Sequence, residues 1–201
     1  MTDNLRIRRG TTRDLDTIIG LIDEAAGWLR GKGTDQWATP WPNRAARDAR
    51  VRRGLRNGHT WIAEAAGRPI GTITSRPHGN QNLWTRQELN VPAVYVSRLI
   101  VTRSAAGLGV GTAMVDWVAA RAVSDWNAQW VRIDVWTTNV ALHNYYEKRG
   151  FRLCRIAACK AEDYPSAALF QKPTSEIDLA AADAFEVDPG SERQLVGATR
   201  D

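Results

Sequence analysis

The chain has 201 residues, of which 43% are hydrophobic and 24% are charged, and this composition is typical of a soluble protein with one domain and a sizeable core. No apolar run approaches the roughly 20 residues that a membrane-spanning helix needs, and the first ten residues lack the apolar stretch of a signal peptide. We therefore expect a cytoplasmic protein without membrane association.

The net charge of +5 is concentrated in residues 44–56, which contain six arginines, whereas residues 176–201 are acidic. A solvated helix face explains the arginines better than a nucleic-acid interface, because no aromatic side chains interleave with them. The three histidines are far apart in the sequence and no CxxC pair occurs. We expect neither nucleic acid nor a metal ion as a ligand.

Hydrophobic periodicity predicts the elements of the first half of the chain. They are, in chain order, a strand (5–8), a helix (15–29), the arginine-rich helix (44–56) and two strands (60–66 and 69–75). Thr11 or Thr12 is a suitable N-cap for the first helix. Gly67-Arg68 is the predicted turn of an antiparallel hairpin.

The second half continues the alternation of helices and strands. Its predicted elements are a loop (76–90), a strand (93–102), a helix beginning at residue 110, a strand (130–136), a helix (139–149) and two strands (151–158 and 167–171). This order predicts an α/β fold with a mixed sheet in one domain, residues 1–173. Residues 174–201 form an acidic tail, for which a short helix and disorder both remain open.

A glycine loop carries the strongest chemical signal. The buried strand 93–102 leads to Gly107, Gly109 and Gly111, which directly precede a helix. Glycine lets the backbone approach a ligand closely, and a helix N-terminus attracts anions. The sequence therefore predicts an anion site made of backbone amides.

Two common phosphate-binding motifs do not match this loop. A P-loop requires a lysine between the last glycine and the hydroxyl residue, but Thr112 directly follows Gly111. The dinucleotide motif GxGxxG requires glycine or alanine where the chain has Thr112 or Met114, depending on the register. Both nucleotide alternatives are therefore weakened.

The segment Ala106-Gly-Leu-Gly-Val-Gly111 resembles the acetyl-CoA-binding motif of the GNAT acetyltransferase superfamily, usually written Arg/Gln-x-x-Gly-x-Gly/Ala. The segment Asn139-Val-Ala-Leu-His-Asn-Tyr-Tyr-Glu-Lys-Arg-Gly-Phe151 resembles the family's Asn-x-x-Ala…Tyr-Glu-x-x-Gly-Phe helix. The predicted element order also matches, from Leu5 to about Lys172. The resemblance implies a GNAT-like mixed, mostly antiparallel central sheet flanked by helices, with acetyl-CoA as cosubstrate.

The resemblance also implies which residues hold acetyl-CoA. The pantetheine arm would pair with the strand edge at Leu99, Ile100 and Val101 in the manner of an added strand, and Asn139 would hydrogen-bond to it. The amides that would bind the pyrophosphate belong to Gly107, Leu108, Gly109, Val110, Gly111 and Thr112.

One position departs from the family motif. Ala106 occupies the Arg/Gln position, so phosphate binding would rest on backbone amides rather than on a motif side chain. Arg103 and Arg149 are candidates to compensate for the missing side chain.

Tyr146 matches the family tyrosine, which implies a general acid for the leaving thiolate, although a core aromatic role remains an alternative. The central strand offers Ser97, a candidate to hold a water, and no carboxylate that could serve as the base. Three carboxylates elsewhere remain open as bases: Glu64, Glu88 and Asp134.

In folds of this family the first two helices and the loop between the last strands build the acceptor pocket. Here these segments supply Trp37, Trp41 and Tyr164, with Glu162 and Asp163 nearby, and Glu64 is a further candidate for substrate binding. Aromatic walls with carboxylates suit a cationic amine.

The leading hypothesis is an N-acetyltransferase that acetylates the primary amine of a small molecule by direct attack in a ternary complex. A protein or peptide N-terminal acetyltransferase is an alternative and predicts an open groove instead of a closed pocket. A non-catalytic acetyl-CoA sensor is another, and a homodimer remains open.

Overall fold

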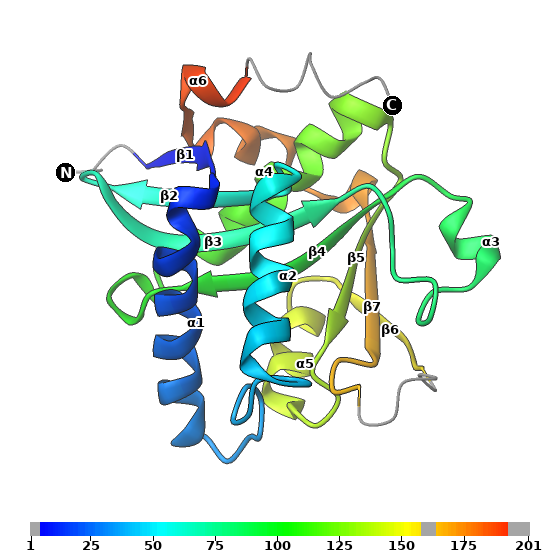
Figure 1. Cartoon of the computed structure of the whole chain (residues 1–201). Helices are drawn as coiled ribbons and strands as arrows, with labels where there is room; N and C mark the ends of the chain where they lie inside the picture. Colours follow the sequence, from blue (N-terminus) through cyan, green and yellow to red (C-terminus); the bar gives the residue numbers. More distant parts are fainter. Residues whose placement is uncertain (1–4, 158–163, 193–201) are drawn as a thin grey trace.

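A twisted sheet with the strand order β6-β7-β5-β4-β3-β2-β1-β8 organises the structure, a computed structural model that describes residues 5–157 and 164–192 (Figure 1). The strands are β1 (Arg6–Arg9), β2 (Thr60–Ala65), β3 (Arg68–Arg76), β4 (Ala93–Val101), β5 (Trp130–Val135), β6 (Arg152–Ile156), β7 (Ala168–Pro173) and β8 (Glu186–Val187). Among the described strands, only the pairs β4–β5 and β1–β8 are parallel. The predicted mixed, mostly antiparallel sheet is confirmed.

Helices cover both faces of this sheet. They are α1 (Leu15–Arg30), α2 (Arg44–Arg56), α3 (Arg86–Leu89), α4 (Val110–Trp126), α5 (Val140–Glu147) and α6 (Pro189–Glu192). Helices α1 and α2 lie side by side in front of the sheet in Figure 1 and pack on Ile62 and Ile100. None of the helices in the described part of the chain is long and apolar enough to cross a membrane.

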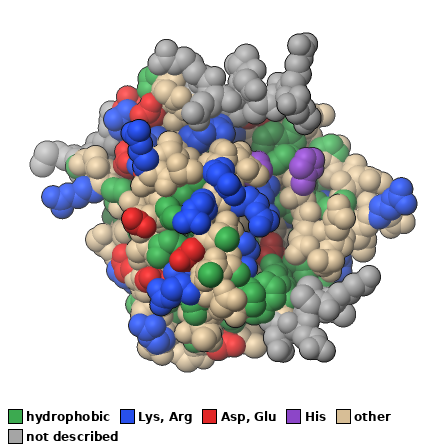
Figure 2. Space-filling view, in the orientation of Figure 1, with side chains coloured by type: hydrophobic (Ala, Val, Ile, Leu, Met, Phe, Trp, Pro, Cys, Tyr) green, Lys and Arg blue, Asp and Glu red, His purple; other side chains and the backbone are tan. Residues whose placement is uncertain are grey.

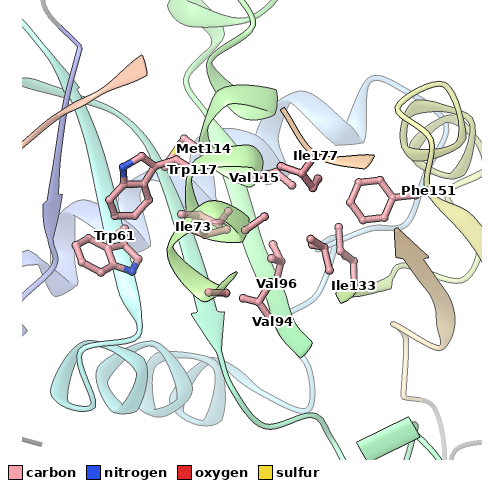
Figure 3. Packing of buried hydrophobic residues seen from close by; sticks show 14 of the residues in the cluster. Trp61, Ile73, Val94, Val96, Met114, Val115, Trp117, Ile133, Phe151 and Ile177 are labelled. Atoms are coloured by element: carbon pink, nitrogen blue, oxygen red, sulfur yellow. The ribbon is translucent and has the colours of Figure 1, made fainter. Parts of the chain in front are cut away.

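The main core lies between the opposite face of the sheet and α4. Val94 and Val96 of β4 pack there with Ile133 of β5 and with the α4 residues Met114 and Trp117 (Figure 3). A second cluster lies under α1 and α2, where the apolar stripe predicted for residues 15–29 supplies Ile18, Leu21 and Ile22. The buried central strand expected at residues 93–102 is thus packed on both faces.

A β-bulge at Arg98 changes the register of β4. Thr72 pairs with Ile100 and Thr74 with Ser97, so one residue of β3 faces two of β4, and Arg98 has a left-handed φ of 49°. Before the bulge, the odd-numbered residues of β4 direct their side chains to the sheet face that α1 and α2 cover. After the bulge, the even-numbered residues of β4 do so.

Two local predictions for residues 60–90 need correction. The hairpin turn is Ala66-Gly67, one residue earlier than predicted, because both residues have positive φ (48° and 72°) while Arg68 already pairs with Ala65. Residues 76–90 are not only loop. They include α3, which begins with a capping box between Thr85 and Glu88.

Residues after Pro173 pack against the same sheet. Two short 3₁₀ segments, Thr174–Glu176 and Leu179–Ala184, lead to β8 beside β1. Ile177 and Phe185 are buried in the main core. Residues 174–192 therefore belong to the same packed unit, and residues 193–201 lie outside the described residues.

Candidate functional site

The parallel strands β4 and β5 separate before either strand ends. Their pairing stops at Val96 and Ile133, although β4 continues to Val101 and β5 to Val135. A cavity of about 1130 Å³ lies at this divergence, lined by residues 96–101 of β4 and 133–136, and walled by residues of α1, α2 and α5. A volume of this order holds a substantial ligand.

The edge of β4 beyond Val96 is available for a ligand. Leu99, Ile100 and Val101 line the cavity, and their segment pairs with β3 on one side but with no described strand on the other. Backbone amide and carbonyl groups at an unpaired edge accept an added strand. The predicted location of the pantetheine arm therefore has the required free edge.

The glycine loop forms the second part of the site. Gly107 and Gly109 have φ values of 82° and 79°, and open space surrounds the positions that a Cβ atom would occupy. Gly109 is the N-cap of α4, whose first intrahelical bond runs from the Ala113 amide to the Gly109 carbonyl. The amides of residues 109–112 are therefore unpaired within the helix, as an anion cradle requires.

The cradle lies at the margin of the cavity and not inside it. Residues 107–112 are absent from the cavity lining, whereas Val101 and Arg103 belong to it. The Leu108 amide donates to the Ala105 carbonyl at 3.4 Å, so it is less available to a ligand than its neighbours. Gly111 lets α4 approach β4 and α5, since its Cβ would lie 3.4 Å from both Val101 Cγ2 and the Tyr145 hydroxyl.

Two arginines flank the cradle. The Arg149 guanidinium lies 3.5 Å from the centre of the Tyr145 ring, and its Nε donates to Thr112 Oγ1 at 2.9 Å in the first turn of α4. Arg103 stacks over Trp28 at 4.2 Å, and its amide donates to Glu24. Both cations are held near the predicted phosphate site, where Ala106 supplies none.

Tyr146 borders the cavity from α5 and is also part of the core. Its ring packs against Tyr145, Phe151 and Phe170. Burial raises the pKa of the Tyr146 phenol well above its ordinary value, so the hydroxyl stays protonated at neutral pH. The two interpretations of Tyr146 are compatible, because the ring fills the core while the residue lines the cavity.

Asn139 has a structural role as the N-cap of α5. Its Oδ1 accepts from the Leu142 amide at 3.0 Å, and its Nδ2 donates to the buried Gln36 at 2.5 Å. One N–H of the side chain remains for a ligand in the cavity that Asn139 lines. Sequence reasoning did not identify Gln36, because nothing in the sequence pairs it with a residue about a hundred positions away.

Asp35 is a second anchor that sequence reasoning missed. It accepts hydrogen bonds from Trp136 Nε1 at 2.9 Å and from the Thr138 hydroxyl. These hydrogen bonds hold the connection between α1 and α2 over the end of β5. The pKa of Asp35 is lowered by the bonds from Thr138 and Trp136.

The three candidate carboxylates lie in different places. Glu64 pairs with Arg8 at 2.8 Å on β1–β2, outside the cavity lining. Glu88 pairs with Arg155 at 2.7 Å, and this ion pair lowers the pKa of Glu88 to about 2. Only Asp134 lines the cavity. The structure therefore does not bring Glu64 together with the other predicted substrate-binding residues.

Asp134 lies at the end of β5 and accepts a hydrogen bond from the Tyr164 hydroxyl at 3.3 Å. Burial raises the pKa of Asp134 above its ordinary value, against the opposing charges of Arg76 and Arg98. Ser97 of β4 lines the same cavity, and its buried Oγ has no hydrogen-bond partner among the described residues. Ser97 thus has the free donor and acceptor that an ordered water needs.

The predicted aromatic walls are present. Trp37, Trp41 and Tyr164 all line the cavity, and the rings of Trp41 and Tyr164 meet edge to face with centroids 5.0 Å apart. Trp37 packs against the α1–α2 cluster. Glu162 and Asp163 lie outside the described residues.

The described cavity lining has more positively charged side chains than the expected aromatic walls with carboxylates. Arg50, Arg76 and Arg98 line it together with Asp134. The arginine-rich helix α2 is thus not simply a solvated face, since Arg50 points inward while Arg52 is exposed. Lys and Arg side chains gather in the middle of the α1–α2 face (Figure 2). Among the described residues, no group of three or more His, Cys, Asp or Glu residues could hold a metal ion.

Comparison with known proteins identifies relatives of this chain. The model of the Acetyltransferase (GNAT) family matches residues 22–151. The chain is 25% identical over 141 residues to an uncharacterized N-acetyltransferase, YesJ, from Bacillus subtilis. The aligned region covers 69% of this chain and 76% of YesJ. The matched region contains the diverging strands, the glycine loop and Tyr146.

Solved structures share the fold. A GNAT-family acetyltransferase from Streptococcus agalactiae superposes with a TM-score of 0.65 at 17% identity, covering 84% of this chain and 95% of its own. A PaiA N-acetyltransferase from Thermoplasma acidophilum in complex with coenzyme A gives a TM-score of 0.60 at 16% identity, covering 84% and 98%.

The conformation of Gly109 can be tested by substitution. A Cβ atom at φ near +79° costs about 1–2 kcal/mol, so Gly109→Ala should disturb the amide cradle and weaken coenzyme A binding by roughly tenfold. Isothermal titration calorimetry measures the affinity. Gly67→Ala is the matched control, because Gly67 has a similar φ of 72° and equally open space in a hairpin turn. Equal affinities of the two variants for coenzyme A would contradict the cradle.

Proposed function

Because the chain belongs to the GNAT acetyltransferase family, we propose that it transfers an acetyl group from acetyl-CoA to the primary amine of a small molecule by direct attack in a ternary complex. Acetyl-CoA supplies an acyl group activated as a thioester. One observation carries the small-molecule part of the proposal: the cavity beside the β4 edge is walled on several sides.

The walls come from segments far apart in the sequence. The connection between α1 and α2 is tied to β5 and α5 through Asp35 and Gln36. Residues 79–82 and 164–166 contribute further lining. A peptide or protein N-terminus would need an open groove here, so these walls favour a small acceptor.

We propose the unpaired edge of β4 and the amides at the start of α4 as the binding site of the cofactor. Leu99, Ile100 and Val101 fit the pantetheine arm, since their segment has a free edge. The amides of residues 109–112 fit the pyrophosphate, with Arg149 fixed beside them. In this arrangement, phosphate binding would rest on the amides and on Arg149, because Ala106 offers no side-chain donor.

We propose Asp134 as the base that receives the proton of the acceptor amine, directly or through a water held by Ser97. An amine attacks a thioester only when it is neutral, although most aliphatic amines are protonated at neutral pH. Asp134 is the one candidate carboxylate that lines the cavity, and its raised pKa makes it a stronger base than an ordinary aspartate.

Tyr146 is the proposed donor to the departing sulfur. A tyrosine phenol is protonated at neutral pH, and burial raises the pKa of Tyr146 further. The amine nitrogen forms a bond to the acyl carbon, the carbon–sulfur bond breaks, and the electron pair leaves on sulfur. For an acceptor that arrives as an ammonium ion, one proton passes to Asp134 and then to solvent, and a second neutralises the thiolate.

The proposed activity is tested by thiol release from acetyl-CoA across a panel of small amines and of peptides with free N-termini. We expect turnover with small amines and little with peptides. Turnover confined to peptides would favour the N-terminal acetyltransferase. Tight acetyl-CoA binding without turnover of any acceptor would favour the sensor, and mass spectrometry of the products identifies the acylated nitrogen.

Asp134→Asn should lower kcat/KM about 100-fold, because amide side chains do not accept a proton at neutral pH. In the wild type, activity should fall as pH decreases through the raised pKa of Asp134, and this acidic limb should be missing in the variant. Asp116→Asn is the control, since burial also raises the pKa of Asp116 but Asp116 does not line the cavity. An unchanged acidic limb in Asp134→Asn would eliminate Asp134 as the base.

Tyr146→Phe should lower kcat by roughly 100-fold while leaving acetyl-CoA affinity nearly intact, because the ring still packs against Phe151 and Phe170. Steady-state kinetics and calorimetry separate the two effects. Tyr145→Phe is the comparison, as it removes the neighbouring hydroxyl from the same helix. A loss of kcat in Tyr145→Phe alone would transfer the role to Tyr145.

A further inference from the structure

The cavity contains a cluster of three arginines from three separate elements. Arg50 comes from α2, Arg76 from the end of β3 and Arg98 from the bulge of β4. Tyr164 and Asp134 lie beside them and line the same cavity. The bulge contributes directly, because its extra residue is Arg98 itself.

The described partners of these arginines leave most of their positive charge uncompensated. Arg50 donates to the Trp41 carbonyl and stacks over the Trp41 ring, and neither contact is an ion pair. The buried Nε of Arg76 has no hydrogen-bond partner among the described residues. Within the described ranges, no carboxylate lies within ion-pair distance of Arg50, Arg76 or Arg98.

The lowered pKa of Arg98 supports the conclusion that the positive charge of the cluster is largely uncompensated. Burial, together with the nearby charges of Arg76 and Arg50, lowers the pKa of Arg98 to about 10, while Asp134 and Tyr164 oppose the shift. Buried charges that lack partners are costly in free energy. Among the described carboxylates, Asp134 is the one beside these three cations, so this part of the cavity would gain stability when an anion binds.

Other charged groups at the cavity are already engaged. Arg47 is paired with Asp23 and Asp48. Lys32 and Arg103 stack on Trp28. Stacking on Trp28 does not neutralise Lys32 and Arg103, but these two cations lie at Trp28, whereas the three clustered arginines lie beside Asp134 and Tyr164.

We propose that the acceptor is an amine carrying a carboxylate or phosphate near its amino group, and that Arg50, Arg76 and Arg98 bind this oxyanion. The inference rests on the proposed function and specifies its substrate class. Guanidinium groups match the geometry of carboxylate and phosphate oxygens, and the hydrogen bonds are charge-assisted. Polycationic amines are excluded as preferred acceptors, because they would place like charges together in the cavity.

The test compares acceptors that differ only in the anionic group. The pairs are L-phenylalanine with L-phenylalaninamide, and phosphoethanolamine with ethanolamine. The amide's amine is less basic than that of the amino acid, so an enzyme limited only by neutral amine would favour the amide. Within a pair, we expect kcat/KM to be at least about tenfold higher for the anionic compound. Comparison of L-phenylalanine with phosphoethanolamine then identifies carboxylate or phosphate as the group bound.

Arg76→Gln and Arg50→Gln should each reduce this preference by about tenfold or more without changing coenzyme A affinity. Arg52→Gln is the matched control, because it removes the same charge from an exposed position of α2. Two results would overturn the inference while leaving the acetyltransferase activity established. One is turnover of neutral or polycationic amines as efficient as that of the anionic ones. The other is a loss of kcat/KM in Arg76→Gln that is equal for all acceptors.

Binding without turnover keeps the two proposals distinguishable. A thermal shift of the protein is measured with L-phenylalanine, L-phenylalaninamide, phosphoethanolamine and ethanolamine in the absence of acetyl-CoA. Stabilisation by an anionic compound alone, lost in Arg76→Gln, would support the anion site even if no acceptor were turned over. Absence of any such stabilisation at millimolar concentration, together with no preference in turnover, would overturn the site.

Discussion

The divergence of β4 from β5 is the constraint on which the rest of the site depends. The two strands stop pairing at Val96 and Ile133, and the backbone of β4 beyond that point needs another hydrogen-bond partner. The bulge at Arg98 lies immediately after the divergence. It turns Ile100 toward α1 and α2 and leaves Leu99 and Val101 on the α4 side. The divergence therefore leaves the free edge of β4 at the cavity, and the adjacent bulge sets the position of Arg98.

The open sheet requires covering segments, and their anchors explain the shape of the cavity. Asp35 and Gln36 connect the α1–α2 segment to residues at the end of β5 and the start of α5. Trp41 is positioned by Arg50 and Tyr164 at the same wall. The hydrogen bonds of Asp35 and Gln36 cross about a hundred residues of sequence, so the proposed acceptor side of the site depends on tertiary structure, whereas the glycine loop is local.

This difference explains what could be predicted from the sequence. The glycine loop and the helix after it are contiguous, and periodicity alone places Ile18, Leu21 and Ile22 on one face of α1. The direction of the arginines on α2 could not be predicted, because the helix has almost no apolar face on which to base an orientation. The position of Glu64 outside the cavity lining could not be predicted for a related reason: alternation predicts its strand but not the ion pair with Arg8. The burial of Phe185 in the main core likewise depends on tertiary packing that no local pattern encodes.

The arginines and Asp134 would have complementary effects on the proposed acceptor amine. Positive charges near an ammonium ion lower its pKa and so favour the neutral form that attacks. A bound oxyanion would weaken that effect, but it would also fix the amine in position, which accelerates attack by reducing its freedom of motion. Asp134 keeps a raised pKa because burial outweighs the charges of Arg76 and Arg98. As the proposed proton acceptor, Asp134 would thus remain effective beside a cationic cluster, since desolvation and not charge pairing dominates its surroundings.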